Sequence, residues 1–321
     1  MNYDEAVDLI RRSSFATHQD ALIDRLLPTV RIETARVSSD DLTLGESRFG
    51  GEPDVPSDFV WPLAPDGTPL SFLAQIDLAA ISAIHADELL PRAGWLFFFY
   101  NNTSDCWGID VKDFGQWRVI LVEHERDRLQ RFAPLTNEVM RRRTVWSAST
   151  LQFEKLYVLP SSRSLEHDIH GPFISRHADD AVTSGKVPLD SSAYDRALFA
   201  LIRPSYRVRP EHRLLGYPCE VQGAMTNDFH GLIEARPQRE SINPFTGEKM
   251  IFRGRPAPEC SAEMKELLGG SEDWRLLLQI DSEKAIPDWM WGDLGMLYFW
   301  IPRQRLEQRD FDSTWMFLQC S

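Results

Sequence analysis

Cysteine is scarce in this sequence of 321 residues, and the few cysteines are widely spaced. Cys106, Cys219, Cys260 and Cys320 form no Cys-x-x-Cys pair. Pairs at that spacing are typical of zinc sites and of thioredoxin-like redox motifs, so neither is predicted. We therefore expect free thiols, as in a reducing compartment, and no cofactor.

Long hydrophobic runs are also missing, and a secretory leader is not predicted. Apolar runs such as Trp95 to Tyr100 suit a buried strand and are far too short to cross a bilayer. The first five residues, Met1 to Glu5, are acidic where a secretory signal is basic and then apolar. These features predict a cytoplasmic protein that has no membrane partner.

Positive charge is in short supply. The chain has 35 Lys and Arg against 48 Asp and Glu, which gives a net charge of −13. A surface of this sign repels nucleic acid and anionic lipid, so no nucleic-acid partner is predicted. It favours a basic partner, or it simply keeps the protein soluble.

Three short motifs occur twice in the chain, in the same order and without internal gaps. They are Arg-x-x-Gly-x-Pro from Arg48 and Arg213, Leu-x-Gln-Ile-Asp up to Asp77 and Asp281, and Gly-x-Leu-aromatic-Phe from Gly94 and Gly295. Length changes fall between the motifs and never inside them. An ordered recurrence of this kind predicts two duplicated units, which usually face each other about a pseudo-twofold axis.

Strand patterns interleaved with short helices and many turns predict an α+β fold, built mainly from antiparallel sheet. Apolar residues at helical spacing predict an N-terminal helix within residues 4–27, stopped by Pro28. We divide one integrated globular unit into four segments. They are an N-terminal helix and strand (1–41), a first repeat (42–125), a variable connector (126–209) and a second repeat (210–321).

The repeated Gln-Ile-Asp motifs place polar groups in apolar strands. Gln75 and Asp77 share one strand face, as do Gln279 and Asp281, because alternate side chains of a strand point the same way. Polar groups in such surroundings need hydrogen-bond partners. In a structural reading, each Asp caps a following helix and each Gln ties strands across the pseudo-axis.

Two further points concern these polar pairs. Arg48 and Arg213 have the charge needed to neutralise the acids and complete a buried network. In a functional reading, both Asp residues instead line a ligand cleft. The sequence offers no nucleophile or base partnered to them, so no catalytic residue is predicted.

Two other clusters invite a functional reading. His167, His170 and His177 match no zinc or iron spacing, so no metal site is predicted. Trp289 and Trp291 lie in a turn flanked by acids, where exposed aromatic residues would anchor a protein partner. The alternative for this pair is core packing at the mouth of the second sheet.

The second repeat resembles the YwqG-like family of bacterial proteins. The motifs that carry the resemblance are His212 to Pro218, Trp274 to Ser282, Trp291 to Ile301 and Phe317 to Ser321, with Arg48 to Pro53 and Phe72 to Asp77 in the first repeat. The family is formally one of unknown function and is associated with bacterial toxin systems, where some members are thought to be immunity proteins. The resemblance carries over no catalytic residues.

Charge and resemblance together lead to a functional expectation. We expect a non-enzymatic binding protein, an immunity protein that neutralises a cognate and basic bacterial toxin by direct binding. The alternative is a small-molecule-binding protein or enzyme with a cleft at the junction of the two repeats. A third reading is an interaction scaffold that uses the connector.

Overall fold

The computed structural model describes residues 2–38, 41–84, 89–103, 105–132, 146–167, 173–175, 187–202, 210–234, 239–242, 249–252, 257–269, 273–284 and 287–320. Its main element is a sheet of ten strands joined only by antiparallel pairings. From edge to edge the strands are β16 (Trp315–Gln319), β15 (Met296–Pro302), β14 (Trp274–Asp281), β11 (His212–Leu214), β1 (Leu27–Arg36), β8 (Ser149–Val158), β2 (Arg48–Phe49), β4 (Ser71–Asp77), β5 (Trp95–Tyr100) and β6 (Trp117–Val122).

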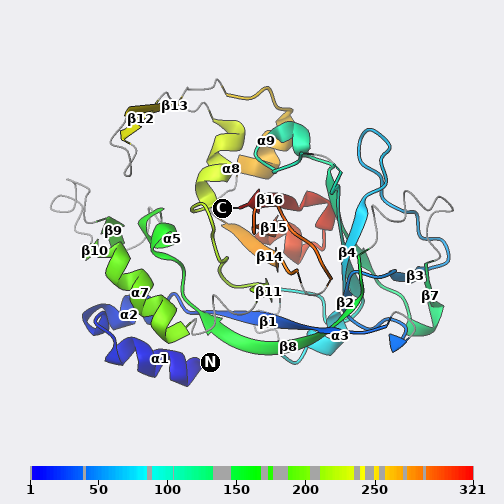
Figure 1. Ribbon diagram of the computed structural model, residues 1–321, viewed down its shortest axis with the longest axis horizontal. Helices are drawn as coiled ribbons and strands as arrows, with labels where there is room; N and C mark the ends of the chain where they lie inside the picture. Colours follow the sequence, from blue (N-terminus) through cyan, green and yellow to red (C-terminus); the bar gives the residue numbers. More distant parts are fainter. Residues whose placement is uncertain are drawn as a thin grey trace.

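Short helices and three small sheets complete the fold (Figure 1). The helices are α1 (Tyr3–Arg12), η1 (Ala16–His18), α2 (Gln19–Ile23), α3 (Leu78–Ile81), η3 (Val111–Asp113), η4 (Arg126–Arg128), α5 (Ser162–His167), α7 (Ser191–Ile202), α8 (Thr226–Ile233), α9 (Ala262–Gly269), α10 (Arg303–Glu307) and η6 (Phe311–Ser313). The small sheets pair β3 (Asp54–Pro56) with β7 (Leu129–Arg131), β9 (Phe173–Ser175) with β10 (Val187–Leu189), and β12 (Arg239–Ile242) with β13 (Lys249–Phe252). The predicted mainly antiparallel sheet with an N-terminal helix is confirmed.

The N-terminal helix is shorter than the sequence pattern predicts. It begins with a capping box, in which the side chains of Asn2 and Glu5 each accept the other's backbone N–H at 2.9 Å. It ends at Arg12, because Ser13 takes an extended backbone and its hydroxyl donates to the carbonyl of Ile10. Pro28 lies inside β1 and does not stop a helix.

From each edge of the main sheet inward, four strands run in reverse chain order: β16, β15, β14 and β11 from one edge, and β6, β5, β4 and β2 from the other. We call β2, β4, β5 and β6 the first half of the sheet, and β11, β14, β15 and β16 the second half. In both halves the motif strands pair in the same register. Arg48 is opposite Gln75 in the first half, and Arg213 is opposite Gln279 in the second. Between the halves lie β1 and β8, side by side along their whole length (Figure 1).

One face of each half packs into a shared hydrophobic core. Phe98 of β5 meets Phe299 of β15 edge to face at 5.3 Å in this core, and Trp117 of β6 meets Trp315 of the edge strand β16 at 5.0 Å where the two ends of the sheet approach each other. Indole N–H groups also join the halves, since Trp117 donates to the carbonyl of Thr314 and Trp315 donates to that of Gly108. The sheet therefore folds back on itself, and its two ends meet.

The opposite face of each half is covered differently. In the first half, Phe72 and Phe99 pack beneath Trp61 and the segment that carries β3. In the second half, α8 lies over the sheet, and its Phe229 packs on Phe317 at 4.7 Å and on Trp274 at 4.3 Å. Within the described part of the chain, no helix is long and apolar enough to cross a membrane.

Candidate functional site

The two repeated glutamines make the same hydrogen bonds in their own halves. The side-chain oxygen of Gln75 accepts the N–H of Asp54 at 2.7 Å, and its amide donates to the carbonyl of Glu46 at 3.0 Å. Gln279 accepts the N–H of Cys219 at 2.7 Å and donates to the carbonyl of Glu211. Each amide clamps the two backbone segments that flank β2 or β11. The expectation that they tie strands across the pseudo-axis is wrong, because the partners lie within one half.

Because the two glutamines make equivalent hydrogen bonds, removing either one should destabilise the protein to a similar extent. Gln75→Leu and Gln279→Leu should each lower the free energy of unfolding by about 2–5 kcal/mol. Each leaves one buried N–H and one half-buried carbonyl without a partner; a fully buried group left unpaired costs about 1–3 kcal/mol, and the half-buried carbonyl costs less. Urea denaturation of both variants measures the effect, with exposed Gln304→Leu on α10 as a control. A loss under 1 kcal/mol in either variant would contradict the clamp.

The repeated aspartates differ from each other. Asp77 is buried; one carboxylate oxygen caps α3 by accepting the N–H of Ala79 at 3.0 Å, and the other pairs with Arg126. Asp281 is half-buried and accepts the N–H of Glu211 at 2.9 Å, and burial raises its pKa. The predicted helix cap is thus confirmed for Asp77. It is wrong for Asp281, because the chain there turns into a β-bridge between residues 283 and 289.

The repeated arginines do not neutralise these acids, as the sequence reading expected. Arg48 is fully buried and pairs with Asp54, which also binds Arg131 at 2.5 Å. Burial, aided by the positive charge of Arg131, lowers the pKa of Arg48 to about 9. Arg213 pairs instead with Glu211, because Cys219 stands where the first half has Asp54.

Trp289 and Trp291 are buried, so the expectation of an exposed aromatic turn is wrong and the packing alternative holds. Their rings lie 5.2 Å apart at the end of the second half. Trp289 packs on Phe49 at 5.3 Å, and Trp291 packs edge to face on Tyr100 at 6.1 Å. The Nε1–H of Trp289 is buried and has no hydrogen-bond partner.

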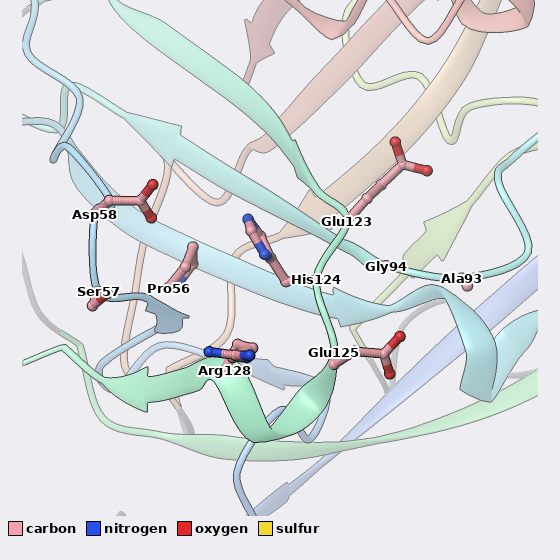
Figure 2. Close-up of a pocket in the computed structure, with 9 residues that line it drawn as sticks. All are labelled: Pro56, Ser57, Asp58, Ala93, Gly94, Glu123, His124, Glu125 and Arg128. Carbon is pink, nitrogen blue, oxygen red and sulfur yellow. The ribbon is translucent and has the colours of Figure 1, made fainter.

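None of the six repeated polar residues lines either of two hollows in the described structure. The first, which we call the outer groove, has a volume of about 800 Å³. Figure 2 shows the imidazole of His124 in the middle of it, with the carboxylates of Glu123 and Glu125 turned away. Its charged side chains are exposed, and Glu123 is engaged by Arg309 at 2.5 Å. Nothing in its lining is buried and reactive.

The second hollow lies where the two halves meet, and we call it the junction cleft. Its volume is about 280 Å³. The lining comes from the segment after β5, from the turn before β15, from β16 and from Trp146, which precedes β8. The residues are Tyr100, Asn102, Asp105, Cys106, Trp107, Trp146, Asp288, Trp289, Met290, Trp291, Gly292 and Leu318.

The lining of the junction cleft is buried and aromatic below, and exposed and acidic above. Tyr100, Trp289 and Trp291 are buried, whereas Asp105 and Asp288 are exposed. Backbone strain marks the rim, because Asp288 has a φ of +67°. The sequence pointed to Trp289 and Trp291 but not to the other residues that line the cleft. The signal for those was the high content of 10 tryptophans, four of which come together in the cleft only when the chain folds.

The titratable groups of the cleft floor stay neutral. Burial raises the pKa of the Cys106 thiol to about 12 and also raises that of Tyr100, whose hydroxyl donates to the carbonyl of Cys106 at 2.8 Å. A thiol in this state is a poor nucleophile. The floor therefore offers a surface for binding rather than a group for chemistry.

A comparison with protein families places most of the chain in one family. A family model described as "Domain of unknown function (DUF1963)" matches residues 47–320. The chain belongs to the DUF1963 family. The DUF1963 match begins just before β2 and ends just after β16, so it takes in both halves, the connector and both hollows. It is consistent with the YwqG-like resemblance. A comparison with curated proteins gave no match.

The histidine cluster falls mostly outside the described residues. His167 ends α5, while His170 and His177 lie outside the described part of the chain. The described residues contain no group of three or more His, Cys, Asp or Glu side chains placed to hold a metal ion.

Proposed function

We propose that this DUF1963 protein is a non-enzymatic binding protein whose ligand site is the junction cleft. The observation that carries the proposal is the lining, with a buried aromatic floor, an exposed polar rim and contributions from both halves. Ligand sites are typically concave and mostly apolar, with a few polar groups that orient the ligand. The proposal corresponds to the alternative expected from the sequence, a small-molecule-binding protein or enzyme with a cleft at the junction of the two repeats. Of those two possibilities we favour binding.

The test uses a library of small metabolites and the melting temperature of the full chain. We expect a compound that raises the melting temperature of the wild type and of Ser57→Trp, which adds bulk to the outer groove. Met290→Trp adds bulk to the rim of the junction cleft and should abolish that rise. Both residues are exposed, so neither change should disturb folding. A compound that stabilises Met290→Trp as well as the wild type would place the site elsewhere.

We also propose that the two halves arose by duplication about a pseudo-twofold axis. The matching order of strands inward from the two edges supports it, as do the equal registers of β2 with β4 and of β11 with β14. A register shift also falls at the same motif position in both halves, between Phe72 and Ala74 and between Leu276 and Leu278. Such an axis runs between β1 and β8, and the junction cleft lies where the halves meet again.

A toxin-neutralising role remains the second candidate. The net charge of −13 and the acidic rim of the cleft favour a basic protein partner. Co-expression with a candidate basic toxin tests it, and rescue of growth together with a complex on size-exclusion chromatography is the expected result. Association should slow as salt rises, because charge steers the encounter. Growth arrest without a complex would defeat this role.

A further inference from the structure

The junction cleft combines the two features that recognise an organic cation. Half-buried Trp107 and Trp146 stand with the buried Trp289 and Trp291 around one hollow. The ring of Trp146 lies edge to face at 5.8 Å from Trp289 and 5.6 Å from Trp291. Four indoles therefore line one hollow, and a cation over the face of an aromatic ring is attracted by the negative charge of that face.

Among the described residues, the rim of the cleft carries negative charge and no positive charge. Asp105 and Asp288 are the charged residues of the described lining, and both are exposed. Asp105 also accepts the indole N–H of Trp107 at 2.7 Å, so one carboxylate stands at the edge of a cage ring. Aromatic walls with carboxylates at the mouth suit a cation and repel an anion.

We propose that the junction cleft binds an ammonium or guanidinium group; this rests on the proposed binding function. The volume of about 280 Å³ fits one such group with a few attached carbons, and excludes a nucleotide-sized ligand. The group belongs either to a free small amine or to a Lys or Arg side chain of a protein partner.

The experiment titrates the full chain with choline while tryptophan fluorescence and calorimetry report binding. The neutral isostere 3,3-dimethylbutan-1-ol replaces the cation, and sodium chloride at equal ionic strength controls for screening. We expect choline to bind at least tenfold more tightly than the isostere. N-acetyl-lysine methylamide is the arm that represents a protein side chain; tighter binding of this probe than of choline would assign the cation to a partner protein.

Rim variants place the site without risk to folding. Asp105→Asn keeps an acceptor for Trp107, and Asp288→Asn tolerates the left-handed backbone. The double variant should weaken choline binding about 5- to 20-fold, and Trp146→Ala about 3- to 30-fold. Glu125→Gln in the outer groove is the matched control and should change nothing.

Three results would overturn the inference. They are equal affinity for choline and its neutral isostere, unchanged affinity in the rim double variant, and no binding of either cationic probe. In the first case the cleft still binds a ligand, so the binding function survives while the cation preference falls. If neither cationic probe binds, the melting-temperature screen with the metabolite library still tests the proposed binding function separately.

Discussion

Gly108→Ala should destabilise the protein by more than about 4 kcal/mol, the largest effect that we expect from any single methyl group. Gly108 has a φ of +72°, where a side chain is strained. A Cβ there would fall on the carbonyl oxygen of Met316 in β16, and backbone cannot move aside as a flexible side chain can. The segment around Gly108 also receives the indole N–H of Trp315 and the N–H of Leu318, so the clash would part the two halves.

Gly67→Ala is the matched control for this prediction. Gly67 has a φ of +85°, but nothing lies within 4 Å of its added Cβ. It should therefore cost only the backbone strain, about 1–2 kcal/mol. Urea denaturation followed by tryptophan fluorescence measures both variants. If the two losses agree within 1 kcal/mol, the close approach of the halves at Gly108 is refuted.

Asp54→Ala should cost about 3–5 kcal/mol, because it leaves a buried positive charge without a partner. Asp54 is fully buried and binds Arg48, Arg131 and the N–H of Gly45. Arg48→Met should cost less, since Asp54 then keeps Arg131. Arg48 also lacks hydrogen-bond partners for Nε and Nη1, so little hydrogen bonding is lost with it.

The exposed pair of Asp8 with Arg12 provides the control. These side chains are 2.8 Å apart on α1 and largely solvent-exposed, so Asp8→Ala should cost at most about 1 kcal/mol. Thermal and urea unfolding of the three variants give the ranking. A loss in Asp54→Ala no greater than in Asp8→Ala would show that the buried charges are satisfied in another way.

Sequence patterns predict the strands well where apolar residues are continuous. The runs from Trp95 to Tyr100 and from Ser71 to Asp77 are strands, because a buried strand needs little beyond hydrophobic side chains and β-branched or aromatic character. The N-terminal helix is predicted in kind but not in length. Its end depends on the local hydrogen bond of Ser13, which a periodic pattern does not report.

The candidate site is much harder to predict, because its residues are distant in sequence. Trp107, Trp146 and Trp291 meet only after the sheet has folded back on itself. The turn at Trp289 looks exposed in sequence, since acids and a proline surround it. Its burial follows from packing against Phe49, a contact 240 residues away in the chain that no local pattern contains.

The pairing of the two central strands has a consequence for folding during synthesis on the ribosome. β1 pairs with β11 of the second half, whereas β8 pairs with β2 of the first. One edge of β1 must therefore wait until residues 212–214 have emerged, long after the strands of the first half are made. An unpaired edge is open to pairing with other chains during that interval. The nascent protein thus has its greatest need of chaperone protection before the second half leaves the exit tunnel.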